Sequence, residues 1–235
     1  MDAFFTLHAG LPREGPGDTA DIAWAAGVAG TGPEARICDA GSGPGGDVAA
    51  LLQAAPKGQV TAIDAHAPFI DIARDRFRTD PRVTLIAGDM ADLTGPFDFI
   101  WSAGAVYFLG IEPALTSWRE ILAPEGAVAF SEPCLFTDTP SEGAVAFWQG
   151  YEPLTDAEGI AAQVRSAGYE TLATRRVPDS GWEKYFGPIE ARISELRADA
   201  DAALAAVLDE EEAEIAGWRA HKAETGYLLS VVRPT

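Results

Sequence analysis

The sequence predicts an α/β fold in which helices cover both faces of a mostly parallel sheet. Short apolar runs alternate with amphipathic stretches between about residues 35 and 131, and Gly or Pro marks most of the joins. This alternation is typical of parallel strands that helices bury on both sides. A chain of 235 residues, 47% of them hydrophobic, is long enough for one substantial core and short for two. We therefore expect a single domain over residues 1–235.

The core of this domain is expected over residues 35–176. Its first five strands correspond to the apolar runs Ala35–Ala40, Gln59–Asp64, Arg82–Ala87, Phe97–Trp101 and Gly126–Glu132. Helices are expected between these strands, near Asp47–Ala55, Pro68–Arg78 and Glu112–Leu122. A further helix begins at Thr155 and ends near Ser166, and a sixth strand follows at Tyr169–Val177.

The segments on either side of the core are expected to cover it. Residues 1–34 supply a turn-rich loop at 10–17, interpreted as a lid, and a helix that Asp18 caps. Residues 177–224 are predicted to form a helical cap, with apolar residues at helical spacing and Asp209–Glu212 in solvent. Within this cap a loop is expected to hold Trp182 and Tyr185. Residues 225–235 contain the last strand, Tyr227–Val232.

Composition and charge restrict the partners. A formal net charge of -19 disfavours nucleic acids and anionic membranes, which draw proteins through Lys and Arg. The longest apolar run, Ile100–Ile111, is shorter than the roughly 20 residues that cross a bilayer. The first residues, from Met1, lack the basic region of a secretory signal, and two cysteines make a disulfide framework improbable. We expect a cytoplasmic monomer or homodimer that acts on a small molecule.

A glycine-rich turn between a strand and a helix is the strongest local signal. Residues 37–47 read Ile-Cys-Asp-Ala-Gly-Ser-Gly-Pro-Gly-Gly-Asp, and such a turn lets a ligand approach bare backbone. Gly41 and Gly43 match the dinucleotide fingerprint when taken with Gly46, and the form found in methyltransferases when taken with Gly45. The glycines alone leave both interpretations open, together with that of a simple tight turn.

Three acids at successive strand ends help to decide between these interpretations of the glycine turn. Asp39 lies two residues before the first glycine, where a carboxylate suits an ammonium group and repels a pyrophosphate. Asp64 ends the second strand, where an acid can accept both hydroxyls of a ribose. Asp89 follows the third strand and can accept a hydrogen bond from an adenine amino group. A dinucleotide site needs the second acid but has no routine need for the third.

This arrangement resembles the class I S-adenosylmethionine-dependent methyltransferase family from about Asp18 to Glu132. The resemblance implies a Rossmann-like seven-stranded sheet of order 3-2-1-4-5-7-6 with an antiparallel last strand and a helical cap between strands 6 and 7. It also implies S-adenosyl-L-methionine as cofactor and S-adenosyl-L-homocysteine as product. The residues it assigns to the cofactor, with their neighbours at the same strand ends, are Asp39, Ala40, Gly41, Ser42, Gly43, Gly45, Asp64, Ala65, His66, Gly88, Asp89, Met90, Trp101 and Ser102.

A narrower similarity covers most of the chain. Five segments resemble a bacterial group of small-molecule methyltransferases of unassigned substrate, namely residues 13–17, 100–107, 131–133, 147–148 and 182–186. Relatives carry an acid where this chain has Ala103, which implies a different acceptor.

The acceptor is expected beyond the carboxyl ends of the fourth and fifth strands, where ligands bind in open α/β sheets. Glu132 and Tyr107 are the candidate catalytic residues, Glu132 as a general base. A carboxylate among aromatic rings would suit an amine through charge pairing and cation–π contact. The candidate substrate contacts are Arg13, Tyr107, Glu132, Trp148, Trp182 and Tyr185.

Two other functions stay open beside methyl transfer to a small acceptor. A non-catalytic regulatory protein could bind S-adenosylmethionine through the same motifs, and a nicotinamide-dependent oxidoreductase could use the same glycine turn. No metal site is expected, because His8, His66 and His221 are scattered and no His, Cys or carboxylate group has ligand spacing.

Overall fold

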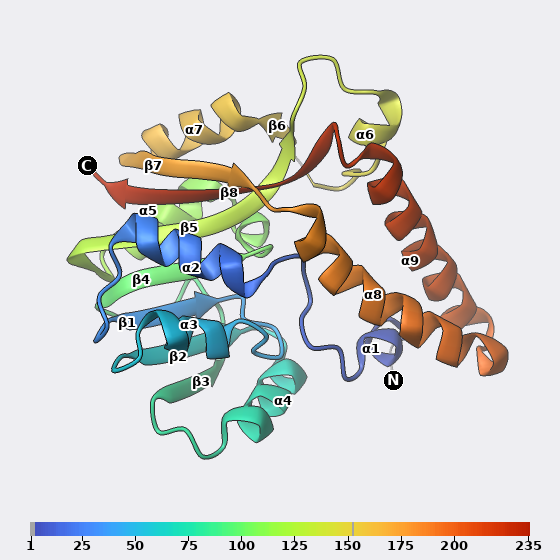
Figure 1. Cartoon of the computed structure of the whole chain (residues 1–235), viewed down its shortest axis with the longest axis horizontal. Coiled ribbons are helices and arrows are strands. Elements are labelled where there is room, and N and C mark those ends of the chain that lie inside the picture. Colours follow the sequence, from blue (N-terminus) through green and yellow to red (C-terminus); the bar gives the residue numbers. More distant parts are fainter. Residues whose placement is uncertain (1–2, 152) are drawn as a thin grey trace.

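In the computed structural model an eight-stranded sheet forms the centre of the molecule (Figure 1). The structure describes residues 3–151 and 153–235, so Met1, Asp2 and Glu152 of the predicted segments lie outside the described residues. The strand order is β3-β2-β1-β4-β5-β8-β7, and a two-residue strand, β6, pairs with β5. The strands are β1 Arg36–Ala40, β2 Gln59–Asp64, β3 Val83–Ala87, β4 Phe97–Ala103, β5 Leu122–Leu135, β6 Thr155–Asp156, β7 Tyr169–Arg176 and β8 Thr225–Pro234.

The predicted sheet order is confirmed, because the extra strand β6 only shifts the numbering of the last two strands. β1 lies between β2 and β4 in parallel register, with Ile37 opposite Val60 and Phe99. β8 runs antiparallel to both of its neighbours and pairs Phe130 of β5 with Ser230. The central strands are buried on both faces, as the near-continuous apolar runs indicated.

Helices cover both faces of the sheet, as predicted. On one face α2 (Thr19–Ala29) and α3 (Val48–Ala54) pack into a core that contains Ile22, Leu51 and Phe99. On the other face α5 (Ile111–Arg119) and α7 (Ala157–Ser166) pack around Trp118 and Val164. The remaining short elements are α4 (Ala67–Phe77) beside β2 and β3, η1 (Val106–Phe108), α6 (Glu142–Ala146) and η2 (Arg197–Asp199).

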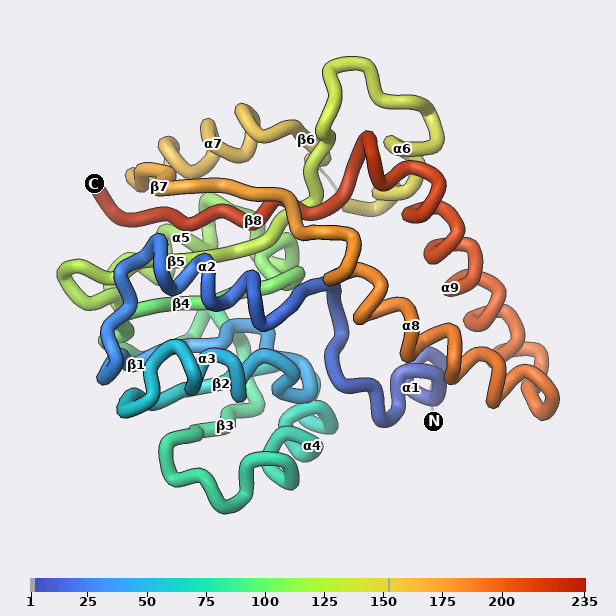
Figure 2. The backbone as a smooth tube through the Cα atoms, viewed as in Figure 1, coloured from blue at the N-terminus to red at the C-terminus, as the bar shows by residue number. Residues whose placement is uncertain are grey.

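Two long helices, α8 (Asp179–Leu196) and α9 (Ala202–His221), form a cap beyond the sheet. The chain enters the cap from the carboxyl end of β7 and leaves it into β8, which runs back antiparallel. The cap therefore stands at the carboxyl ends of the parallel strands. The N-terminal helix α1 (Ala3–His8) contacts both cap helices, and Figure 2 shows the chain passing from it to α2 on the sheet. No helix among the described residues has the length and apolar composition of a membrane span.

Two expectations about the cap are wrong. Trp182 and Tyr185 lie on α8 and not in a loop, because the helix continues through Pro188. Its buried side chains, Trp182, Phe186, Ile189 and Ile193, recur every three or four residues, so their packing outweighs the helix-breaking effect of proline. Glu211 was expected in solvent, yet it is only 8% exposed, because it lies in the same stripe of α9 as Leu208 and Ile215.

Trp118 links the core to the segment that follows β3 and generates a stability prediction. The side chain is fully buried and its indole N–H donates to the carbonyl of Met90 at 2.9 Å. We expect Trp118→Ala to lower the free energy of unfolding by about 3–5 kcal/mol, measured by urea denaturation, because a large cavity forms. Phe108→Ala is the control, since Phe108 is 74% exposed. Equal unfolding midpoints for the two variants would contradict this account of the core.

Candidate functional site

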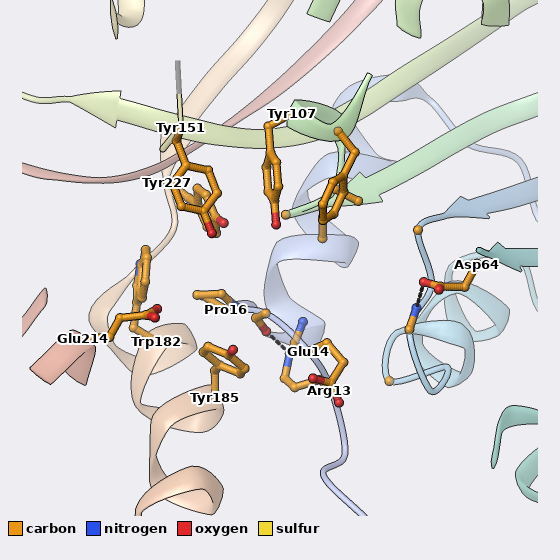
Figure 3. Close-up of a pocket in the computed structure, with 18 of the residues that line it drawn as sticks. Arg13, Glu14, Pro16, Asp64, Tyr107, Tyr151, Trp182, Tyr185, Glu214 and Tyr227 are labelled. Carbon is orange, nitrogen blue, oxygen red and sulfur yellow. Dashed lines mark hydrogen bonds between the residues drawn. The ribbon is translucent and has the colours of Figure 1, made fainter. Parts of the chain in front are cut away.

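A cavity of about 990 Å³ lies between the carboxyl ends of the parallel strands and the cap. Figure 3 shows the strand ends on one side and α8 on the other. The walls come from the N-terminal loop, the glycine turn, the ends of β2 and β3, the segment around η1, and the cap. This is the edge of an α/β sheet at which ligands bind, and the size is sufficient for more than one small ligand part.

The glycine turn between β1 and α3 has a conformation that requires glycine. Gly41 has φ 79° and Gly43 has φ 52°, both in the left-handed region. A Cβ atom on Gly41 would lie 2.3 Å from the Cβ of Ala105, so the turn has no room for a side chain. A ligand at this wall of the cavity would therefore meet bare backbone.

Asp64 holds the glycine turn against the end of β2. Its carboxylate accepts a hydrogen bond from the backbone N–H of Gly43 at 2.8 Å and another from that of His66 at 2.8 Å. Each carboxylate oxygen can accept a further hydrogen bond, and Asp64 lines the cavity. The same side chain can thus support the turn and bind a pair of hydroxyls.

Asp39 is a buried carboxylate that lacks a partner. It is 2% exposed, and its Oδ2 has no hydrogen bond among the described residues. Burial raises the pKa of Asp39, the carboxylates of Asp47 and Asp64 raise it further, and Arg13 opposes them. An unpaired buried acceptor is costly, and a cationic group in the cavity would satisfy it.

The opposite end of this wall offers groups for a flat aromatic ring. Asp89 accepts from the N–H of Ala91 through Oδ1 only, and both Asp89 and Met90 line the cavity. The ring of His66 stacks on Phe5 of α1, with centroids 4.0 Å apart and planes 3° apart. Helix α1 therefore closes over this part of the cavity.

Several predicted cofactor residues do not line the cavity, and two of them instead form hydrogen bonds with residues next to the glycine turn. The indole N–H of Trp101 donates to Asp47 Oδ2 at 2.9 Å, and the hydroxyl of Ser102 donates to the carbonyl of Ala40 at 2.8 Å. Arg13 does line the cavity, and it also donates to Asp47 at 3.1 Å. The predicted residues absent from the lining are Ala40, Gly45, Gly88, Trp101, Ser102 and Glu132.

Glu132, the predicted base, lies on the other face of β5. Side chains alternate along a strand, and Glu132 follows the orientation of Phe130 and Cys134, which belong to the core beneath α5 and α7. Burial raises the pKa of Glu132 to about 8, and its Oε2 has no hydrogen bond among the described residues. Its pKa suits a base, but its position does not put it on the cavity wall.

Aromatic side chains line the part of the cavity that faces the cap, and we call this part the aromatic chamber. Tyr107 contacts Tyr151 with ring centroids 4.9 Å apart and planes at 79°. Trp182 stacks on Tyr227 at 5.2 Å. Figure 3 shows the hydroxyls of Tyr107, Tyr151 and Tyr227 directed into the same space. The chamber consists of Tyr107, Trp148, Tyr151, Trp182, Tyr185 and Tyr227, of which Tyr151 and Tyr227 are not among the predicted substrate contacts.

Sequence analysis also missed three carboxylates, Glu14, Glu211 and Glu214. Glu14 lies over the glycine turn, since a Cβ on Gly43 would be 3.3 Å from its Cγ. Glu211 and Glu214 project from α9 into the cavity. Glu214 is exposed and is one of the residues that line the cavity. For Glu211 the sequence did carry one signal of burial, its spacing along the helix, because it falls between Leu208 and Ile215 on the apolar stripe.

His8 joins the N-terminal segment to the cap. The Nδ1 atom lies 2.6 Å from Glu14 and the Nε2 atom 3.4 Å from Glu211. Burial alone would lower the pKa of His8, but hydrogen bonds to the two carboxylates outweigh it and raise the pKa to about 9. Burial also raises the pKa of Glu14, yet two carboxylates face one imidazole, so His8 keeps an anionic partner.

This arrangement predicts a pH dependence of stability. Because the folded pKa of about 9 exceeds the ordinary value of 6.5, the stabilisation by His8 is complete below about pH 6.5 and is lost as pH rises through 9. Its size is on the order of 3 kcal/mol. We expect the unfolding free energy of the wild type to fall across this range relative to that of His8→Gln, measured by urea denaturation at each pH. Parallel pH curves for the two proteins would show that His8 is neutral.

Comparison with known proteins shows that part of this chain is similar to methyltransferases. Residues 37–126 match a family model described as a methyltransferase domain. A trans-aconitate 2-methyltransferase of Deinococcus radiodurans is 29% identical over 150 residues, 60% of this chain and 57% of that protein. A malonyl-[acyl-carrier protein] O-methyltransferase of Laribacter hongkongensis is 30% identical over 125 residues, 48% of this chain and 41% of that protein. The chain thus spans about half the length of these two relatives.

The fold is also shared over nearly the full length of a solved structure. A methyltransferase from Geobacter sulfurreducens, in complex with S-adenosyl-L-homocysteine, superposes with a TM-score of 0.82 at 18% identity. The match covers 99% of this chain and 98% of that chain, so it includes the cap as well as the sheet.

Proposed function

We propose that this chain, which belongs to the class I S-adenosylmethionine-dependent methyltransferases, transfers a methyl group from S-adenosyl-L-methionine to a small acceptor. The domain match and the shared fold support the family. The observation that carries the activity is the unpartnered Asp39 carboxylate beside a glycine turn with no room for side chains.

The residues present fit the cofactor. Asp39 would pair with the ammonium group of its methionine part, and Glu14, whose Oε1 is also buried without a partner, lies close enough to the glycine turn to assist. Asp64 would bind the ribose hydroxyls, and Asp89 with Met90 would contact adenine beside His66. When bound, S-adenosylmethionine supplies a methyl group on a positively charged sulfur.

The protein contributes mainly by holding donor and acceptor in position and by excluding water from the cavity. The glycine turn and the aromatic chamber are walls of one cavity, so an acceptor in the chamber faces a donor lying on the turn. Holding the two in line can supply up to about 7–11 kcal/mol of the barrier. Helix α1 covers the cavity, and the contacts of His8 with Glu14 and Glu211 hold that cover in place. Tyr107 lines the acceptor part and, as a neutral phenol, can orient an acceptor by a hydrogen bond.

The charge of the cavity favours an amine as acceptor. Carboxylates on its walls come from both the sheet and the cap, namely Glu14, Asp39, Asp47, Asp64, Asp89, Glu211 and Glu214. Arg13 is occupied by the carbonyl of Gly15 and the carboxylate of Asp47. A carboxylic acid would meet repulsion here, whereas an amine would gain charge pairing and cation–π contact.

The two relatives named above leave a carboxylic acid as the second candidate acceptor, because one of them is a trans-aconitate methyltransferase. A dinucleotide fits less well, since a pyrophosphate on the glycine turn would face Asp39 and Glu14. A regulatory protein without turnover would bind the same cofactor and differ only in lacking activity.

We also place the protein in the cytoplasm as a monomer or homodimer, with no nucleic-acid or membrane partner. The formal charge of -19 and the two free, buried cysteines, Cys38 and Cys134, support this proposal.

Cofactor binding is tested by removing the charge of Asp39. We expect Asp39→Asn to weaken binding of S-adenosylhomocysteine by about ten- to a hundredfold, measured by calorimetry, because a hydrogen bond to a charged group is lost. The same change should leave the ligand-free protein as stable as the wild type or more so, since an unpaired buried charge disappears. Asp75→Asn, at an exposed position of α4, is the matched control. Equal affinities for the two variants would place the cofactor elsewhere.

The acceptor class is tested with a panel of small amines, thiols, phenols and carboxylic acids. We expect methylation of amines, detected by mass spectrometry together with formation of S-adenosylhomocysteine, because the cavity walls are acidic and aromatic. Turnover confined to carboxylic acids or thiols would eliminate the amine. Binding of the cofactor with no turnover across the panel would favour a regulatory protein.

A further inference from the structure

A series of ring contacts leads from the buried end of the aromatic chamber to solvent. Trp148 contacts Tyr227 and Tyr151, each with ring centroids 5.3 Å apart. Tyr151 contacts Tyr107 at 4.9 Å, and Tyr107 contacts Phe108 of η1 at 4.4 Å. At the buried end, Tyr227 is 6% exposed and Trp148 is 4% exposed. At the other end, Tyr151 is 37% exposed and Phe108 is 74% exposed.

Phe108 is the most exposed large apolar side chain in the described part of the chain. Two other exposed side chains of this kind, Phe4 and Tyr151, line the cavity together with it. Leu109, which follows Phe108, lines the cavity as well. Exposed apolar side chains that gather at a cavity are typical of a ligand-binding surface.

Polar atoms become fewer along the same series of rings. The indole N–H of Trp148 is already used, because it donates to the hydroxyl of Thr225. The hydroxyls of Tyr107 and Tyr151 are directed into the chamber (Figure 3), where they can bind a polar group of a ligand. Phe108 has no polar side-chain atom and offers only contact with carbon. A ligand that follows the series would therefore have a polar group in the chamber and an apolar group at Phe108.

We propose that the acceptor carries an apolar substituent, an alkyl chain or an aryl ring, that extends from the chamber to Phe108. This inference rests on the proposed methyl transfer and adds the chemistry of the part of the acceptor that does not react. The reacting group lies in the chamber beside the methyl donor, and the substituent covers the exposed ring of Phe108. Affinity increases because apolar surface of both partners is removed from water. Phe108 is thus a specificity-determining residue that selects acceptors by their apolar part.

A part of the acceptor fits this surface better than a protein partner does. A stable protein interface buries about 800 Å² on each side. The remaining exposed large apolar side chains of the described residues, Ile86 on β3 and Val145 on α6, do not line the cavity. Phe108 instead contacts Tyr107 and lines the same cavity as the glycine turn, which connects it with the acceptor.

The test uses two homologous series as probes, the n-alkylamines and the n-alkanoic acids from ethyl to octyl. The wild-type protein is saturated with S-adenosylhomocysteine, and affinity is measured by NMR titration. We expect affinity to rise about two- to fourfold with each methylene in the series that binds, and fourfold corresponds to about 0.8 kcal/mol for a fully buried CH₂. Because both series carry the same chains, the result does not depend on the acceptor being an amine.

Phe108→Ala should weaken binding of the hexyl compound about fivefold or more, because the longer chain loses its contact at residue 108. The same change should leave binding of the ethyl compound and of S-adenosylhomocysteine nearly unchanged. Ile86→Ala is the matched control, because Ile86 is also an exposed apolar residue but lies on β3 outside the cavity lining. This control should bind the whole series as the wild type does.

The proposal is overturned if S-adenosylhomocysteine binds while affinity in both series is independent of chain length. It is also overturned if Phe108→Ala and Ile86→Ala bind the hexyl compound equally. In that case, a wild-type dimer that Phe108→Ala dissociates would assign the exposed ring to a second copy of the chain. A chain-length dependence confined to the acids would support the substituent and eliminate the amine. Failure of S-adenosylhomocysteine itself to bind the wild type would refute the proposed function instead.

A matched pair of variants decides the case in which Phe108→Ala also loses S-adenosylhomocysteine. Leu and Asn have similar shapes and differ in polarity. Phe108→Leu should therefore bind the hexyl compound more tightly than Phe108→Asn does. Equal binding by the pair overturns the proposal.

Discussion

The main electrostatic constraint on this site is the repulsion among carboxylates that converge on one cavity. Asp39, Asp64 and Glu14 surround the glycine turn, and Glu211 and Glu214 face it from the cap. The cations closest to them, His8 and Arg13, already have partners among these acids or next to them. An excess of negative charge in a poorly solvated space is costly unless a positive ligand enters. A sulfonium cofactor with an ammonium group, and an amine beside it, are ligands that meet this condition.

The same charges connect the cover of the cavity to its contents. His8 on α1 is held between Glu14, which touches the glycine turn, and Glu211, which belongs to the cap. One buried histidine thus joins the N-terminal segment, the segment beside the glycine turn and the cap. Glu14 contacts His8 and also lines the cavity beside the glycine turn. A cation bound on that turn would therefore interact with the same carboxylate that pairs with His8 of helix α1.

Local sequence patterns were sufficient for the sheet and for the glycine turn with the acids beside it. The strand order follows from the alternation of elements and the family resemblance, and the glycine turn with its acids lies within one stretch of the chain. Parallel strands expose their carboxyl ends at a common edge, so residues at successive strand ends meet without further information. Trp101 and Ser102 share this edge yet turn away from the cavity, since alternation and hydrogen bonds direct them to Asp47 and Ala40.

The cap side of the cavity depended on long-range packing. The position of Glu132 in the sequence, at the end of a predicted strand, suits a general base. The alternation of side chains along β5 instead directs it to the sheet face that α5 and α7 cover. Glu214 lies in a run of acids that resembles a solvent-exposed helix, and only the docking of α9 over the sheet brings it to the cavity.

The sequence by itself determined the fold, the cofactor class and the backbone cradle, because these depend on periodicity and on residues close together in the chain. Only the tertiary structure decided which carboxylates reach the cavity from the cap. That choice depends on how α9 lies relative to the carboxyl ends of the strands, and no local pattern encodes the rotation of one element against another.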